Sequence, residues 1–139
     1  MIKILVIKFM DEYKVGETKF VKYQFQEDVL SGKHIVDDIH YLQSLVNGDF
    51  DRFNIQKLAD EGIAVYYNKK SQDSQLSPSV TVKISNEELL YGNIVFVGYD
   101  TETGDGISLT TEQLNLIYSL FHRSVFKINN TLVTGYFCY

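Results

Sequence analysis

Residues 2–9, Ile-Lys-Ile-Leu-Val-Ile-Lys-Phe, decide the fold. Both sides of this stretch are apolar when it is extended, one side formed by Ile2, Ile4 and Val6 and the other by Leu5, Ile7 and Phe9. Because a strand of this kind is covered on both faces, we expect it to be central in a sheet. Ile94-Val95-Phe96-Val97 has the same property, and we expect it beside the first strand.

Further strands are predicted around this central pair. Asp11 to Glu17, which contains Gly16, is predicted to be a turn. The alternation of Val21, Tyr23 and Phe25 then predicts a half-exposed strand that forms a hairpin with the first. Similar patterns predict strands near residues 53–55, 63–67 and 80–84, and a C-terminal hairpin over residues 125–138 with its turn at Asn129-Asn130.

Two segments have helical spacing of their apolar residues. Residues 36–47, followed by Gly48, predict one helix. Thr110 and Gln113 have the spacing of a capping box and start a second at about 111–122. Residues 85–88 also have this spacing, which predicts a short helix at about 86–91. We therefore expect an α+β fold, a mixed and mainly antiparallel sheet with helices on one face.

The composition limits the domain organisation and the kind of partner. The 139 residues are enough for a single domain, 1–139, and residues 68–79 are polar and aperiodic, which predicts an exposed flexible loop. The one cysteine, Cys138, excludes an internal disulfide, and no signal peptide or membrane helix is visible, so we expect a cytoplasmic protein without a membrane partner. A net charge of -5 argues against direct nucleic-acid binding.

No group of residues predicts catalytic chemistry, a metal site or a cofactor. His34, Asp37, Asp38 and His40 have spacing that could suit a metal, but acids in the first turn of a helix are better explained by capping. Cys138 would need a histidine beside it to act as a nucleophile, and a terminal cysteine flanked by aromatic residues is usually a small apolar side chain.

The loop from Asp100 to Gly106 begins like a calcium-binding loop, with carboxylates at alternate positions. It departs from that pattern afterwards, because Asp105 stands where glycine is required and Thr111 stands where glutamate is required. A turn between a strand and the next helix is the better interpretation.

Three segments carry a family resemblance: Leu45-Val46-Asn47-Gly48-Asp49-Phe50, then Gly62 to Asn68, and above all Tyr91 to Gly98 followed by Ser108-Leu109-Thr110-Thr111-Glu112-Gln113. Over residues 37–121 the chain resembles a family of uncharacterised small proteins encoded on phages, plasmids and conjugative elements of Gram-positive bacteria. The resemblance implies a mobile-element context and a bacterial host cell, and it supplies no site residues. Residues 1–34 and the last hairpin look like additions to the family pattern.

The context and the charge favour one functional hypothesis. The chain is predicted to bind a host protein, inhibiting a defence system such as restriction or CRISPR interference, and not to be an enzyme. The alternatives are a protein that binds a small molecule or signalling nucleotide and an unrecognised enzyme. The chain could also form a homodimer. The candidate interaction residues are Tyr23, Tyr66, Tyr67, Lys69, Lys70, Asp100, Glu102 and Asp105.

Overall fold

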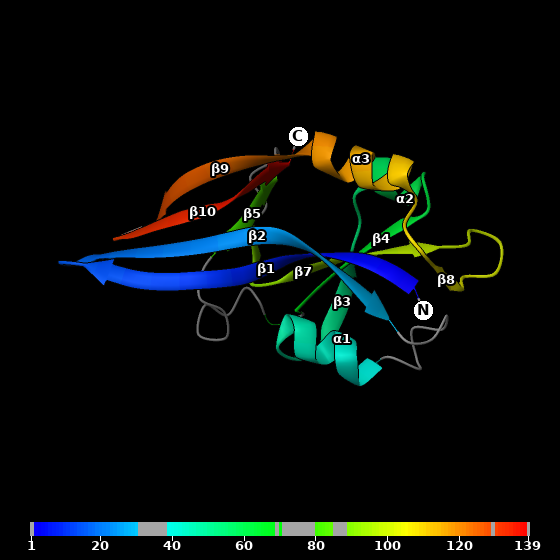
Figure 1. Ribbon diagram of the computed structural model, residues 1–139, viewed down its shortest axis with the longest axis horizontal. Coiled ribbons are helices and arrows are strands. Elements are labelled where there is room, and N and C mark those ends of the chain that lie inside the picture. The colour runs from blue at the N-terminus through cyan, green and yellow to red at the C-terminus, as the bar shows by residue number, and fades with distance from the viewer. Residues whose placement is uncertain are drawn as a thin grey trace.

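The computed structural model describes residues 2–30, 39–68, 70, 80–84, 89–128 and 130–138. Of these residues, 61% lie in strands and 19% in helices. The protein is therefore mainly β, and the prediction of an α+β fold with two main helices is wrong. The strands form one sheet whose eight-strand path curls into a half-barrel (Figure 1).

The sheet is mixed, and its strand order differs from the chain order. Along the path lie β3 (Phe50–Phe53), β4 (Ile63–Asn68), β7 (Ile94–Tyr99), β1 (Ile2–Val15), β2 (Thr18–Leu30), β10 (Thr131–Cys138), β5 (Val80–Ile84) and β6 (Leu89–Tyr91). Off this path, β8 (Gly106–Ile107) pairs with β7, and β9 (Phe121–Ile128) pairs with β10. Among the described strands only the pairings of β10 with β2 and with β5 are parallel.

β1 lies in the middle of this sheet, as its sequence predicts. It pairs with β2 on one side and with β7 on the other. Leu5 and Ile7 point to the larger apolar core, which we call the inner face, and Ile4 and Val6 point to a smaller core on the opposite, outer face. The prediction that strands 2–9 and 94–97 are neighbours is thus confirmed.

Helices cover both faces, so the prediction of helices on one face is wrong. α1 (Ile39–Val46) packs Leu42 and Leu45 onto the outer face. α2 (Gln56–Ala59) and α3 (Thr111–Leu120) bring Leu58 and Ile117 to the inner face (Figure 1). None of these helices is long and apolar enough to cross a membrane, within the part of the chain that the structure describes.

An aromatic cluster fills the inner face where β2 and β10 separate. The Phe25 ring lies 4.5 Å from that of Tyr136 and 6.2 Å from that of Phe96, between centroids. The backbone N–H of Phe25 donates to the Tyr136 hydroxyl at 3.2 Å. Tyr136 therefore supplies the hydrogen bond that a neighbouring strand would otherwise give.

Several predicted boundaries are wrong. β1 continues to Val15, so the turn predicted over residues 11–17 is reduced to Gly16-Glu17. Residues 89–91 of the predicted short helix form β6, which pairs with β5, and residues 85–88 lie outside the described part of the chain. The strand predicted near 53–55 is β3 at 50–53, because Ile55 already precedes α2.

Both main helices end earlier than predicted. α1 (Ile39–Val46) ends one residue before the predicted end, and residues 36–38 of the prediction lie outside the described residues. α3 begins with the predicted capping box of Thr110 and Gln113 but ends at Leu120, because β9 starts at Phe121 without a loop. Asn68, assigned to the predicted flexible loop, is a buried end of β4, and residues 69 and 71–79 lie outside the described residues.

Candidate interaction surface

The tyrosines predicted to bind a partner do not share one surface. Tyr23 is fully buried against Phe9 in the inner core, so its ring is not available to a partner. Tyr66 is half-buried on the outer face, with its ring 5.4 Å from that of Phe50, and burial raises the pKa of Tyr66. Tyr67 packs on the inner face. The sheet thus separates these side chains.

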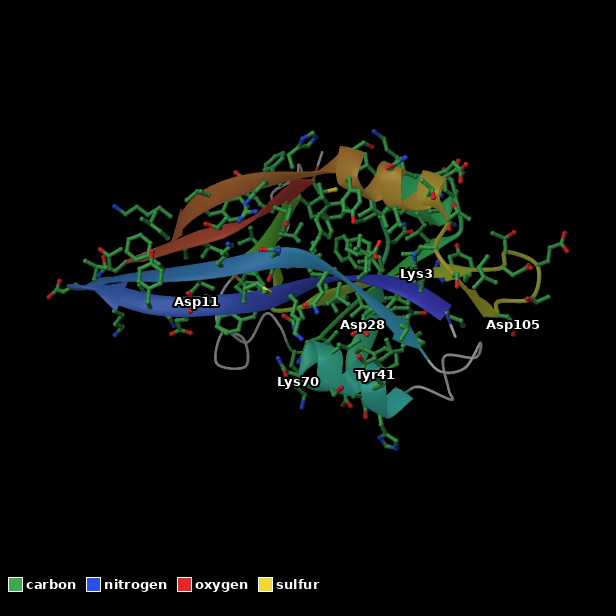
Figure 2. All side chains as sticks on the ribbon, in the orientation of Figure 1. Lys3, Asp11, Asp28, Tyr41, Lys70 and Asp105 are labelled. Atoms are coloured by element: carbon green, nitrogen blue, oxygen red, sulfur yellow. The ribbon has the colours of Figure 1, made fainter. Side chains whose placement is uncertain are left out.

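The predicted lysines and histidines gather into no described site. Lys70 is exposed just after the end of β4 (Figure 2), and its backbone N–H donates to the side-chain amide oxygen of Asn68 at 2.8 Å. His40 is exposed on α1. Lys69, and His34, Asp37 and Asp38 of the alternative metal interpretation, lie outside the described residues.

The acidic loop uses its first carboxylate to hold its own backbone. Asp100 accepts hydrogen bonds from the backbone N–H groups of Glu102, at 2.8 Å, and Thr103, at 3.2 Å. The Asp105 N–H donates to the hydroxyl of Thr103, at 3.3 Å. Among the described residues, no three His, Cys, Asp or Glu side chains are grouped so that they could hold a metal ion. The loop is therefore a turn between β7 and β8.

A shallow, open depression lies beside this loop. Its volume is about 550 Å³, and four of its side chains are acids. Carboxylates at this density disfavour an anionic ligand, such as a nucleotide phosphate. The lining consists of Asp60, Glu61, Gly62, Tyr99, Asp100, Thr101, Glu102, Ile107 and Gln113.

Two buried asparagines from the segments that carry the resemblance hold the C-terminal end of α1. Asn93 donates to the carbonyl of Leu45 at 2.7 Å and accepts from the N–H of Phe9 at 2.8 Å. Asn68 donates to the carbonyl oxygens of Val46, at 3.0 Å, and Asn47, at 3.1 Å. The last carbonyls of a helix have no partner within it, so these amides satisfy groups that would otherwise be buried without one.

The segment Ser108 to Gln113 has a similar structural role. The Ser108 hydroxyl accepts from the N–H of Lys3, and the Leu109 N–H donates to the Lys3 carbonyl, both at 3.0 Å. The Gln113 amide donates to the carbonyl of Glu61 at 2.8 Å. These residues that carry the resemblance therefore have structural roles in the fold.

A β-bulge in β1 creates a candidate interaction surface. The register of β1 with β2 shifts between Phe9 and Asp11, which leaves Met10 as the extra residue. Directly paired residues share a face of a sheet, and Val21, the partner of Glu12, belongs to the inner core. Tyr13 and its partner Phe20 therefore lie on the outer face, where their rings stack with centroids 4.9 Å apart.

The neighbouring strands continue this surface. β10 places Leu132 beside Phe20 and Thr134 beside Lys22, and β9 places Val125 beside Thr134. The part of β1 and β2 beyond the bulge, together with the residues of β9 and β10 that lie beside it, is called the arm. Its surface on the outer side is called the outer arm face and consists of Asp11, Tyr13, Phe20, Lys22, Val125, Leu132 and Thr134. These residues line an apolar groove of about 300 Å³, to which Val21 also contributes.

The outer arm face exposes much of its apolar area. Tyr13 is 54% and Val125 is 64% exposed, and Val15 beside the groove is 63% exposed. α1 covers the outer face around Ile4, whereas no described helix covers the arm, which extends away from α1 (Figures 1 and 2, where Asp11 marks the arm). Contiguous exposed apolar side chains with a polar rim are typical of interaction sites.

The sequence interpretation missed these residues. Asp11 to Glu17 was predicted to be a turn, which hid the alternation of Asp11, Tyr13 and Val15. This alternation is the signal by which these residues could have been recognised as a strand. Because of the bulge at Met10, the alternation after residue 10 is shifted by one residue relative to that of residues 2–9. The pairing of β10 with β2, which brings Leu132 to Phe20, leaves no trace in local sequence.

Cys138 does not supply a nucleophile. Burial raises the pKa of its thiol to about 11, an effect that nearby Lys57 partly offsets. The strand register opposes Cys138 to Phe121 and not to His122. The reactive form of cysteine is the thiolate, so burial disfavours the reactive form of this thiol near neutral pH.

Comparison with known proteins gives one match. The family described as a domain of unknown function, DUF3846, matches residues 23–122. No curated protein and no solved structure matches the chain. The matched span contains Asn68, Asn93 and Gln113, and every residue of the outer arm face lies outside it.

Proposed function

Since the chain belongs to the DUF3846 family, whose function is unknown, we propose from its surface that it is a binding protein and that the outer arm face contacts a host protein. The observation that carries the proposal is the exposed apolar groove formed by Tyr13, Phe20, Leu132 and Val125. Aromatic and aliphatic anchors of this kind form the centre of protein interfaces, and charged residues form the rim.

The groove has such a rim. Asp11 and Lys22 lie opposite each other on neighbouring strands at one end of the groove. A partner that covers the groove would keep these charges at its edge, where they select orientation at little cost in desolvation.

The class of partner comes from the resemblance to proteins of phages, plasmids and conjugative elements. Such a protein acts inside a bacterial cell, and we propose a component of a host defence system, such as restriction or CRISPR interference, as its target. The alternative of a signalling-nucleotide binder draws no support from the acidic depression beside Asp100. The alternative of an enzyme receives no support from Cys138, because the raised pKa of its thiol disfavours the thiolate.

Site-specific photocrosslinking in the host cell tests the proposal. A photoreactive phenylalanine analogue replaces Tyr13 or Val125 in the arm, and in the control it replaces Tyr118, which is 44% exposed on α3. We expect positions 13 and 125 to capture the same host protein, and position 118 not to capture it. The captured protein, once purified, should bind wild type and lose affinity at least tenfold for Tyr13→Ala with Val125→Ser, because a few central anchors carry most interface energy.

Two results would overturn the proposal. One is capture of the same proteins from position 118 as from the arm, which would mean that the arm is not selective. The other is an adduct of two copies of this chain at position 13, which would replace the host protein by a homodimer.

A further inference from the structure

β9 forms an open edge of the sheet. Its eight residues, Phe121–Ile128, pair with β10 on one side, and no other described strand pairs with them (Figure 1). An edge strand presents backbone N–H and C=O groups to which a further strand can bind. Since Val125 belongs to both β9 and the outer arm face, a strand added here would extend that face.

The exposed side chains of β9 are positively charged. Arg123, Val125 and Lys127 alternate along the strand and are all exposed, while Phe126 between them packs against the inner core. Among the described residues, no carboxylate forms an ion pair with Arg123 or Lys127. A chain with a net charge of -5 thus places two cations and no acid along this edge.

We infer that β9 binds an extended acidic segment of the partner, with the pattern acidic, any residue, apolar, any residue, acidic. This rests on the proposed binding function and specifies the partner's chemistry. In an added strand, alternate side chains lie beside Arg123, Val125 and Lys127, so two acids would meet the two cations and the apolar residue would meet Val125. The backbone would supply affinity and the side chains would supply selectivity.

A second copy of this chain is a poor occupant of the same edge. Two β9 strands in an antiparallel pair centred on Val125 would bring the exposed valines together. The same register would put Arg123 of each copy opposite Lys127 of the other, and like charges directly opposite each other destabilise a strand pair. The basic residues therefore disfavour self-pairing in this register and favour an acidic segment.

Binding of synthetic peptides to the full-length protein tests the inference. The probe contains Glu-Thr-Val-Thr-Glu, and the control contains Lys-Thr-Val-Thr-Lys. We expect the control to bind at least tenfold more weakly, since each of its two cross-strand pairs changes from attractive to repulsive. The exposed double variant Arg123→Glu, Lys127→Glu should reverse this preference, and circular dichroism checks that it is folded.

N-methylated probes separate strand addition from binding by side chains alone. Alternate N–H groups of a strand point to the same neighbour, so one probe is methylated on Glu and Val and another on Thr. We expect one of these probes to lose binding and the other to keep it. Backbone amides of residues 121–128 should also gain protection from hydrogen exchange with the unmethylated probe.

Three results would overturn the inference: no binding of the acidic probe at millimolar concentration, equal binding of acidic and basic probes, or equal loss with both methylated probes. Each is distinguishable from failure of the proposed function. If a host protein is captured at Tyr13 but no peptide binds at β9, the proposed host partner is supported and the inferred contact with β9 is wrong, so that the partner contacts the groove alone.

Discussion

The side chain of Asn93 joins two strands of the sheet, β1 and β7, to the helix α1 on its outer face. It links the end of α1, through the Leu45 carbonyl, to β1, through the Phe9 N–H, and it is itself at the start of β7. We expect Asn93→Ala to lower the free energy of unfolding by about 3 kcal/mol, because both backbone groups would stay buried without a partner. Chemical denaturation measures this loss.

Asn115→Ala is the matched control, since Asn115 is exposed on α3 and alanine favours a helix. If Asn93→Ala lowers the free energy of unfolding by no more than this control does, the hydrogen bonds of Asn93 contribute nothing to stability.

Cys138 gives a second prediction for a single residue. With a thiol pKa raised to about 11 by burial, the thiolate fraction at pH 8 is about one in a thousand. We expect iodoacetamide at pH 8 to leave the native protein unmodified over hours and to modify it completely in guanidinium chloride, as measured by intact mass. Full modification of the native protein within minutes would show that the thiol is accessible and reactive, which would contradict this prediction and support a chemical role for Cys138.

At the scale of elements, the predictable parts are those with two apolar faces or a complete capping signal. Residues 2–9 of β1, residues 94–97 of β7 and the start of α3 follow from local sequence alone. The short helix predicted at residues 86–91 fails because its capping pattern is local, whereas Leu89–Tyr91 gain strand partners in β5. Pairing with the preceding strand overrode the helical preference of these residues.

Gly135 shows the close packing that the pairing of β5 with β10, two strands far apart in the sequence, requires. A Cβ at this position would lie 2.4 Å from the backbone oxygen of Thr81, where β5 meets β10. We expect Gly135→Ala to cost about 3 kcal/mol of unfolding free energy, because backbone cannot move aside without separating the strands. Thermal or chemical denaturation measures the loss.

Gly16→Ala is the control for this change. Nothing lies within 4 Å of a Cβ there, but φ is +63°, so only the backbone penalty of about 1 kcal/mol applies. Equal losses in the two variants would mean that β5 does not approach β10 as closely as the structure shows.

α1 is also attached to β2, and this contact depends on pH. The Tyr41 hydroxyl donates to Asp28 at 2.6 Å (Figure 2), and this hydrogen bond, together with burial, raises the pKa of Tyr41 from 10.0 to about 12. A pKa raised by folding gives stability that is complete below pH 10 and is lost as the pH rises from 10 to 12.

We expect Tyr41→Phe to be less stable than wild type at pH 8 by no more than about 1 kcal/mol, because Tyr41 is 40% exposed and solvent screens the pair. The difference should shrink above pH 10, which urea denaturation at several pH values can follow. A difference that is constant up to pH 11.5 would contradict the assigned role of the hydrogen bond.

At the scale of the whole molecule, the candidate site lies where the sequence was least informative. The motif residues Asn68, Asn93 and Gln113 hold the fold together, and the outer arm face is assembled from both ends of the chain. Its residues become neighbours only through the bulge at Met10 and the parallel pairing of β2 with β10. The alternation of Asp11, Tyr13 and Val15 is a local signal of the bulge, whereas no pattern within one segment encodes the pairing of β2 with β10.

The charges on β9 allow the oligomeric state to be changed by one substitution. Arg123→Glu places a glutamate opposite Lys127 in the antiparallel register centred on Val125, twice per symmetric pair of chains. Two repulsive pairs become two attractive pairs, each worth up to about 1 kcal/mol. We therefore expect this variant to dimerise at least tenfold more tightly than wild type at low ionic strength, as measured by sedimentation equilibrium.

The double variant Arg123→Glu, Lys127→Glu restores like charges in that register and should sediment as wild type does. Lys14→Glu, which gives the same net charge as Arg123→Glu but lies in β1, should not dimerise either. If the single variant shows no stronger association than these two controls, β9 is closed to further strands, and the inferred binding of an acidic segment fails together with it. Dimerisation of the single variant alone would show that the edge accepts a strand when the opposing charges match.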